Sequence, residues 1–296
     1  MKQKFTIIAN CQTCIVDFLL SNPNFENIYQ YIPLYTVHTT TQNDIDNIYN
    51  IIENIDLLLI QPINNNYKDL INFGTYNIIS KTKPSCKIIL FPSLHLNYYY
   101  PFCSYIFNNK THKMLRSPID YHDRNLINIC KQYESLDIIT DKFKEIVNNI
   151  NLNDEEYCSS MFKNSINLLI KREEEYLSFI PEEKKNNTSI INSSSYIFEN
   201  YKIKLLFYSM NHPTKYLFHY ICDQIFNMLQ IPLNKYPDTI DPLIHNNVPI
   251  LYNFLSKNID FDISTIPIII NGKQISIDEF VKIYYDVYSK LDLSEY

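Results

Sequence analysis

The fold is decided by the stretch FTIIANCQTC, residues 5–14. Its first half, Phe5 to Ala9, is a short apolar run with β-branched residues, which is typical of a buried strand. Asn10 stands where a helix N-cap belongs, and apolar residues then recur at helical spacing as far as Leu20. The stretch therefore predicts a strand that passes directly into a helix, with Cys11 at the junction.

Two later segments repeat the buried-strand pattern. DLLLIQP (residues 56–62) and KIILFP (residues 87–92) are apolar runs that each stop at a proline. Helical spacing precedes the first of them at Asp44–Asn54, and a helix interrupted at Gly74 is expected between them, over Tyr67–Ser80. This alternation predicts an α/β fold with three layers, in which a parallel sheet has helices on both faces.

Open parallel sheets place their chemistry beyond the carboxyl ends of the strands. Three loops are therefore expected to converge there: Asn10–Gln12, Gln61–Tyr67 and Pro92–Tyr100. Gln61 is a polar residue directly at a strand end, which makes it a candidate for lining a site.

The middle of the chain has a different character. Long helical patterns cover residues 123–150 and 154–177, and the charged run KREEE at 171–175 is expected to be a solvated helix face. Pro181–Ser195 is expected to be a polar loop. We expect three parts along the chain: the first part of the α/β core at 1–118, a helical insertion or cap at 119–200, and the rest of the core at 201–296.

The last part returns to sheet-like patterns before a helical C-terminal region. A strand is expected at Lys202–Phe207, and a helix at Thr214–Leu229 with Pro213 at its first position. The Asn271-Gly272 pair predicts a β-hairpin turn within residues 268–275.

Composition excludes several classes of protein. With only 2 Gly residues among 296, the chain has no glycine-rich phosphate loop. A net charge of −6 without a basic block argues against nucleic-acid binding. The 7 scattered cysteines favour a reducing compartment, and neither a signal peptide nor a membrane span is indicated. We therefore expect a cytoplasmic protein.

Cys11 is the strongest candidate for a reactive group. Free N–H groups and the helix dipole at a helix start lower the pKa of a thiol, and the same N–H groups bind the oxyanion of an acyl transfer. The alternative is that Cys11 and Cys14 are small packing residues. The two also match a thioredoxin-like dithiol, although the helical middle fits that compact domain poorly. No second ligand pair accompanies them, so no metal is expected.

The segment SMNHP, residues 209–213, supplies a candidate base. His212 follows a predicted strand, and imidazole is the usual base for a thiol or hydroxyl nucleophile. Asn211 is a candidate cap for the helix that follows. No carboxylate stands where it would orient the ring, so the orienting group must come from elsewhere. The alternative is a loop histidine without a role.

The segment FPSLHLNYYYP, residues 91–101, follows a strand and combines aromatic residues with a histidine. Such a loop is suited to lining a pocket for an organic ligand, with His95, Tyr99 and Tyr100 as candidates. The alternative is an aromatic core segment.

Together these segments resemble the WcbI family of polysaccharide-biosynthesis enzymes. The resemblance rests on the strand followed by Asn10-Cys11-Gln12, on DLLLIQP with Tyr67 downstream, on the segment 91–101, and on Asn211-His212-Pro213. These pieces lie within residues 1–105 and 200–230. The chain departs from the family pattern at Ala9, where glycine is usual.

The resemblance implies a fold like that of SGNH hydrolases, binding of coenzyme A, and acetyl transfer from acetyl-CoA to a sugar of a capsule or surface polysaccharide. It implies that Cys11 is the family cysteine, with Asn10 and Gln12 as its neighbours, and that His212 is the family histidine. Without a glycine loop, side chains and helix ends would hold the phosphates of coenzyme A. The available cations are Arg116, Arg124 and Lys215.

We therefore expect an acyltransferase in which Cys11 is the nucleophile or lies beside the acyl group, and His212 is the general base. The N–H of Cys11 or Gln12 and the side chain of Asn10 or Gln61 are expected to stabilise the oxyanion. Two mechanisms stay open: an acyl-enzyme on Cys11, or direct activation of the sugar hydroxyl by His212.

Three alternatives to a transferase stay open as well. They are an SGNH-like esterase or deacetylase that uses water as acceptor, a non-catalytic binding protein of a glycan system, and the dithiol. The expected partner is a small molecule or glycan, and a homo-oligomer is possible.

Overall fold

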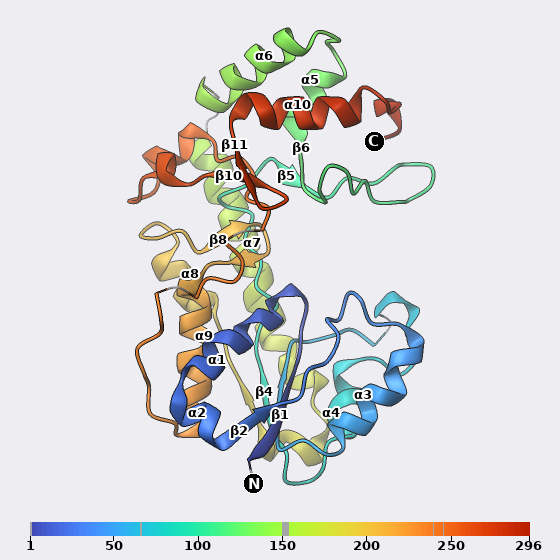
Figure 1. The fold of residues 1–296 in the computed structure, drawn as a ribbon, viewed down its shortest axis with the longest axis vertical. Coiled ribbons are helices and arrows are strands. Elements are labelled where there is room, and N and C mark those ends of the chain that lie inside the picture. Colours follow the sequence, from blue (N-terminus) through green and yellow to red (C-terminus); the bar gives the residue numbers. More distant parts are fainter. Residues whose placement is uncertain (1, 66, 150–153, 239, 245) are drawn as a thin grey trace. The chain divides into compact units, whose positions relative to one another are not determined.

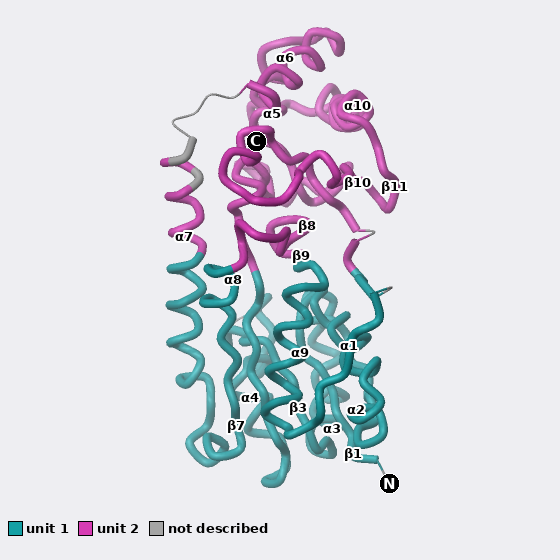
Figure 2. Tube along the Cα trace, turned by 90° about the vertical axis from the view of Figure 1, so that its left-hand side faces the viewer, with its two compact units in different colours: residues 1–94, 166–199, 213–242 teal, residues 95–165, 200–212, 243–296 magenta. Residues whose placement is uncertain are grey.

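The structure is a computed structural model that describes residues 2–65, 67–149, 154–238, 240–244 and 246–296. The chain forms two compact units (Figure 2). Unit 1 comprises Met1–Leu94, Ile166–Glu199 and Pro213–Pro242, and unit 2 comprises His95–Ser165, Asn200–His212 and Leu243–Tyr296. Within the described ranges, no helix is both long enough and apolar enough to cross a membrane.

Unit 1 is built on a five-stranded parallel sheet with the order β2-β1-β3-β4-β7. Its strands are β1 (Gln3–Ile8), β2 (Tyr29–Tyr31), β3 (Leu57–Ile60), β4 (Lys87–Leu90) and β7 (Thr188–Ile190). All four residues of β3 are buried, as a central strand covered on both faces requires. In this doubly wound order the winding reverses between β1 and β3, and the carboxyl ends of these two strands border the usual ligand crevice.

Helices cover both faces of this sheet (Figure 1). Those of unit 1 are α1 (Ile15–Ser21), α2 (Pro23–Ile28), α3 (Ile45–Ile52), α4 (Thr75–Ser80), α8 (Ser194–Asn200), α9 (Lys215–Leu229) and the part of α7 (Asp154–Glu175) from Ile166 onward. On one face, Phe18 of α1 packs against Phe218 of α9 with ring centroids 5.6 Å apart. On the other face, α3 and α4 bury their isoleucines against β3 and β4. The predicted α/β fold with a parallel sheet is confirmed.

The loop after β3 is fixed by a close approach at Gly74. A Cβ atom there would lie 2.2 Å from the Oδ1 and 2.8 Å from the Cα of Asn65. Next to it, Thr75 accepts from the N–H of Ile63 at 2.7 Å and donates its own N–H to the Ile63 carbonyl at 3.0 Å. These contacts hold the start of α4 against the end of β3. The helix predicted from Tyr67 is therefore wrong in its first half, since α4 begins only at Thr75.

Unit 2 consists of short strands and helices. They are β5 (Cys103–Ser104), β6 (His122–Asp123), β8 (Phe207–Ser209), β10 (Ile268–Ile270), β11 (Lys273–Ile275), α5 (Arg124–Cys130), α6 (Leu136–Asn149) and α10 (Ile277–Tyr288). The predicted hairpin is confirmed, and Asn271 (φ 51°) and Gly272 (φ 76°) both have the positive φ of its tight turn. The helical pattern at 123–150 corresponds to α5 and α6, whereas Ile150 lies outside the described residues.

Three sequence predictions need correction. The loop expected at Pro181–Ser195 contains β7, which was missed because it is a short edge strand whose Thr188 and Ser189 weaken the apolar signal. The strand expected at Lys202–Phe207 is wrong except at its last residue, because β8 begins only at Phe207. β8 pairs with β9 (His212–Pro213) and does not belong to the central sheet.

The start of α9 also differs from the prediction. Pro213 belongs to β9, Thr214 is the N-cap and Lys215 is the first helical residue, so neither Pro213 nor Asn211 has its expected place at the helix start.

Candidate functional site

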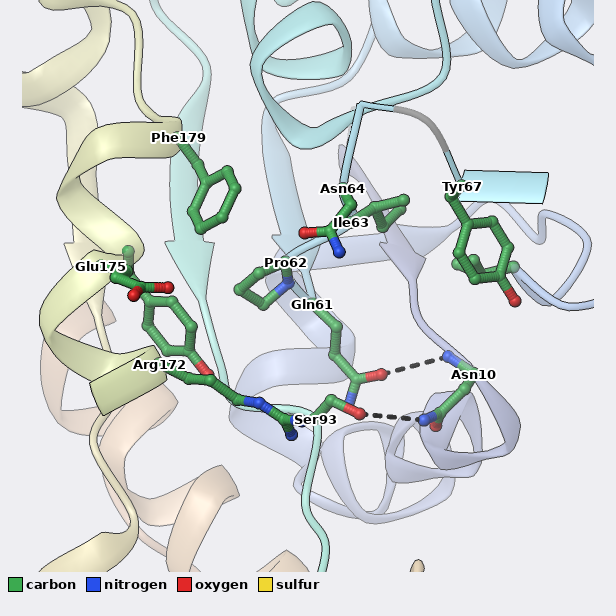
Figure 3. Close-up of a pocket in the computed structure, with 12 residues that line it drawn as sticks. Asn10, Gln61, Pro62, Ile63, Asn64, Tyr67, Ser93, Arg172, Glu175 and Phe179 are labelled. Atoms are coloured by element: carbon green, nitrogen blue, oxygen red, sulfur yellow. Dashed lines mark hydrogen bonds between the residues drawn. The ribbon is translucent and has the colours of Figure 1, made fainter. Parts of the chain in front are cut away.

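A cavity of about 470 Å³ opens in unit 1 where β1, β3 and β4 end (Figure 3). Its volume is in the range of small-molecule sites. It is lined by residues from the three strand ends, from nearby loops and from the end of α7 with the turn that follows: Asn10, Val37, Gln61, Pro62, Ile63, Asn64, Tyr67, Ser93, Arg172, Glu175, Tyr176 and Phe179. The three loops that were expected to converge therefore all contribute to one cavity.

Asn10 connects the end of β1 to the ends of β3 and β4. Its backbone N–H donates to Oε1 of Gln61 at 3.1 Å, and its Nδ2 donates to Oγ of Ser93 at 3.2 Å (Figure 3). Its Oδ1 accepts from the N–H of Gln12 at 2.9 Å, which is the N-cap contact predicted from the sequence. The backbone and side chain of Asn10 thus connect three loops at the cavity edge.

Gln12 and Gln61 form a buried amide pair beneath Asn10, with exposures of 0% and 3%. Nε2 of Gln61 donates to Oε1 of Gln12 at 2.6 Å and to the carbonyl of Pro92 at 3.1 Å. Nε2 of Gln12 donates to the carbonyl of Leu94 at 2.9 Å. The N–H groups of the Gln61 amide and the backbone N–H of Gln12 therefore already donate to groups of the protein. Neither is available to stabilise an oxyanion, contrary to the expectation from the sequence.

Cys11 is a neutral thiol at pH 7. Burial raises its pKa to about 11, and the opposing effect of its own backbone N–H is smaller. The turn it starts, Cys11–Cys14, is only four residues long, and the thiol donates to Oδ1 of Asn10 at 3.8 Å. The prediction of a lowered pKa is therefore wrong, because desolvation by burial outweighs the lowering effect of the backbone N–H. Burial also raises the pKa of Cys14, so neither thiol resembles the activated thiol of a dithiol oxidoreductase.

The charged run at the end of α7 was expected to be a solvated face, and this is wrong only for Glu173, since the other four residues are exposed. Arg172 and Glu175 line the cavity, and Figure 3 shows Arg172 extending toward Ser93. Glu173 is 7% exposed and accepts hydrogen bonds from the N–H groups and hydroxyls of Ser193 and Ser194. The face is polar because it contacts a cavity and a helix start.

His212 belongs to unit 2, where Tyr121 orients its ring. The Tyr121 hydroxyl donates to Oδ1 of Asn211 at 2.6 Å, so at 3.3 Å it accepts the Nε2–H of His212. Nδ1 then carries the lone pair, and it is buried without a partner among the described residues. Burial lowers the pKa of His212 to about 4, so the imidazole is neutral. Tyr121 is the orienting group that the sequence left open.

The remaining aromatic candidates divide between cavity and core. Tyr67 lines the cavity. Tyr99 and Tyr100 are only 0% and 2% exposed, and the Tyr99 hydroxyl donates to the carbonyl of Tyr201 at 2.6 Å. Both rings therefore belong to the core of unit 2, which agrees with the alternative of an aromatic core segment. The Tyr99 hydroxyl has its hydrogen-bond acceptor within the same unit. His95 is a half-buried residue of the same unit.

None of the three cations expected to contact phosphate is among the residues that line the cavity. The Arg116 guanidinium is 3.5 Å from the Asp120 carboxylate in unit 2, and Nε of Arg124 donates to Ser104 at 3.0 Å. Lys215 is the first residue of α9 in unit 1.

Comparisons with known proteins define the family. The family model described as polysaccharide biosynthesis enzyme WcbI matches residues 4–234. The chain belongs to the WcbI family. A solved WcbI structure is similar to it with a TM-score of 0.81 and 18% sequence identity, over 100% of this chain and 92% of that one. That structure is described as a novel polysaccharide biosynthesis enzyme, as native protein without a disulfide bond between coenzyme A and one of its cysteines. A comparison with curated proteins finds no match.

WcbI membership confirms the resemblance seen in the sequence. The structure adds residues that the sequence did not reveal as part of the site. Arg172, Glu175 and Tyr121 were missed because each is separated from the motif residues along the chain, whereas Ser93 lies within the segment 91–101 and was not singled out there. The spacing of Arg172 and Glu175, three residues apart on one helix, was the only available signal.

Proposed function

We propose that the chain transfers an acyl group, expected to be acetyl, from coenzyme A to a sugar hydroxyl during polysaccharide synthesis. The observation that carries the proposal is the Asn10–Cys11 turn, held by three strand ends at the edge of a cavity. Membership of a family of polysaccharide biosynthesis enzymes supports it. The pairing of coenzyme A with a cysteine in the description of the similar structure supports the choice of donor.

Within this proposal, the SGNH-hydrolase-like relationship, the helical insertion at 119–200 and the cytoplasmic location stay proposals too. The strand order β2-β1-β3-β4-β7 supports the first of them, since it is a doubly wound order with the site at the β1/β3 switch point.

The thiol end of coenzyme A fits beside Cys11. The neutral, half-buried thiol of Cys11 and the amide of Asn10 suit an uncharged thioester. Binding of this end of coenzyme A does not require a phosphate-binding loop. When bound, acetyl-CoA supplies an activated acyl group. Lys215 stays the candidate in unit 1 for a phosphate contact.

The neutral state of Cys11 favours direct transfer over an acyl-enzyme. In the direct route, Nδ1 of His212 accepts the proton of the sugar hydroxyl while the sugar oxygen forms a bond to the acyl carbon. The bond from that carbon to sulfur breaks, and the thiolate of coenzyme A leaves. Of the donors expected for the oxyanion, the N–H of Cys11 and the Asn10 amide stay candidates, since Gln61 and the Gln12 N–H are engaged.

Ligand binding tests the proposal directly. Thermal unfolding is expected to shift upward with coenzyme A or acetyl-CoA, because a ligand that binds only the native state stabilises it by about 2.7 kcal/mol at 100 times its Kd. An esterase that uses water would instead cleave an aryl acetate and show no shift with coenzyme A. No shift at millimolar coenzyme A would contradict the proposed donor.

The pH dependence of kcat/KM tests the role of His212. Burial lowers its pKa from an ordinary 6.5 to about 4, so the neutral base persists down to about pH 4. We expect kcat/KM to be flat from about pH 5 upward and to fall only near pH 4, where Nδ1 becomes protonated. If kcat/KM instead falls near pH 6.5, the base has the ordinary pKa of a histidine, which would contradict the role of His212.

A further inference from the structure

The cavity in unit 1 has a lining that is unusual for a site of phosphate binding. It contains a single guanidinium, that of Arg172, and a single carboxylate, that of Glu175, and it contains no lysine. Arg and Lys side chains make the strongest hydrogen bonds to phosphate groups, and an excess of them favours a nucleotide with several phosphates. The two opposite charges in this cavity cancel, so it is poorly suited to the phosphates of coenzyme A.

The same lining is well suited to a sugar. Arg172 provides several N–H donors, Glu175 provides acceptors, and Asn64 provides both, which together match the mixed donor and acceptor character of sugar hydroxyls. Tyr67 and Phe179 supply flat apolar surfaces at the cavity wall (Figure 3), and the C–H face of a pyranose ring is apolar.

The two charged side chains of the cavity have no ion-pair partner in the described part of the chain. Among the described residues, Arg172 and Glu175 form no ion pair, either with each other or with another residue, although both lie on the last turn of α7. Both side chains are exposed. Their donors and acceptors are therefore open to a ligand at little cost in lost protein contacts.

We propose that this cavity binds the acceptor sugar, with Arg172 and Glu175 contacting its hydroxyls. This inference rests on the proposed acyl transfer. A sugar there would lie against Asn10, whose Oδ1 accepts from the thiol of Cys11, so a hydroxyl at the inner end of the cavity is next to the position given to the acyl group. The cavity then determines which sugar is used, while the donor is bound outside it.

Saturation-transfer NMR on the full-length chain tests the site with defined probes. The probes are the methyl glycosides of glucose, galactose, mannose, N-acetylglucosamine and glucuronic acid at millimolar concentrations. We expect at least one glycoside to bind, and Arg172→Ala and Glu175→Gln each to weaken it about tenfold, as loss of a charged hydrogen bond does. Lys171→Ala and Glu174→Gln are matched controls on the same helix, exposed and outside the lining, and they should leave binding unchanged.

Coenzyme A binding, followed by thermal shift in the same variants, separates this inference from the proposed function. We expect Arg172→Ala to retain the wild-type shift with coenzyme A. If Arg172→Ala abolishes that shift, the cavity holds the donor and the inference is overturned. It is also overturned if no glycoside binds, or if the control variants weaken binding as much. If wild-type protein binds a glycoside in this cavity but never coenzyme A, the proposed donor fails and the sugar site stands.

Discussion

His212→Ala is expected to lower kcat for acyl transfer by about 10²–10⁴-fold, the usual contribution of a general base. The reason is the lone pair on Nδ1, which is buried and has no partner among the described residues, while Nε2–H is held by Tyr121. Affinity for coenzyme A should be unchanged, because the imidazole acts on the acceptor hydroxyl. Steady-state kinetics and thermal shift together measure both quantities.

Two further variants keep this prediction specific. Tyr121→Phe removes the hydroxyl that orients the ring and should lower kcat by a smaller factor, without changing the binding of coenzyme A. His112→Asn changes an exposed histidine whose φ of 55° asparagine tolerates, so it should leave kcat at the wild-type value. A His212→Ala enzyme with wild-type kcat would remove the general base from the mechanism.

Gln12→Leu is expected to lower the free energy of unfolding by about 3 kcal/mol or more, because it leaves several buried groups without a partner, each costing about 1–3 kcal/mol. One Nε2–H of Gln61 loses its acceptor, and the N–H and carbonyl of Leu94 lose the Gln12 amide. Activity should fall with stability, since the same amide pair positions the loops around Asn10. Chemical denaturation followed by circular dichroism measures the change.

The control for that substitution is Gln30→Leu, which changes an exposed glutamine of β2 in the same unit and should alter stability by less than about 0.5 kcal/mol. The double variant Gln12→Leu/Gln61→Leu should cost less than the sum of the single variants, since each single variant strands the partner amide. An unfolding free energy that Gln12→Leu leaves unchanged would show that the amide pair does not hold the strand ends together.

The central strands were predictable because their signal is local. Phe5–Ala9, DLLLIQP and KIILFP are each apolar without interruption, and burial on both faces of a parallel sheet requires that pattern. The edge strands β2 and β7 are three residues each and half polar, and they are defined by pairing with neighbours far away in sequence. Nothing within either segment reveals that pairing.

In the candidate site too, local contacts were predictable from the sequence and contacts that depend on packing were not. Asn10 was predictable as a cap, since the contact from its side chain to the Gln12 N–H is only two residues long. The sign of the Cys11 pKa shift was not predictable, because the helix start could be seen in the sequence whereas the desolvation that outweighs it depends on packing. Arg172 looked like one more charge on a solvated helix until the fold brought it to the strand ends.

The most direct test of the central claim, that the thiol end of coenzyme A lies beside Cys11, is peptide mapping after incubation with the symmetric disulfide of coenzyme A. Exchange would give a Cys11–coenzyme A disulfide and release one free coenzyme A thiol. A thiol with a pKa of about 11 reacts slowly in free encounters, so labelling must depend on binding. We predict that Cys11 is labelled before the other cysteines, and about tenfold faster than by glutathione disulfide. Equal rates with the two disulfides, or labelling that spares Cys11, would contradict the claim.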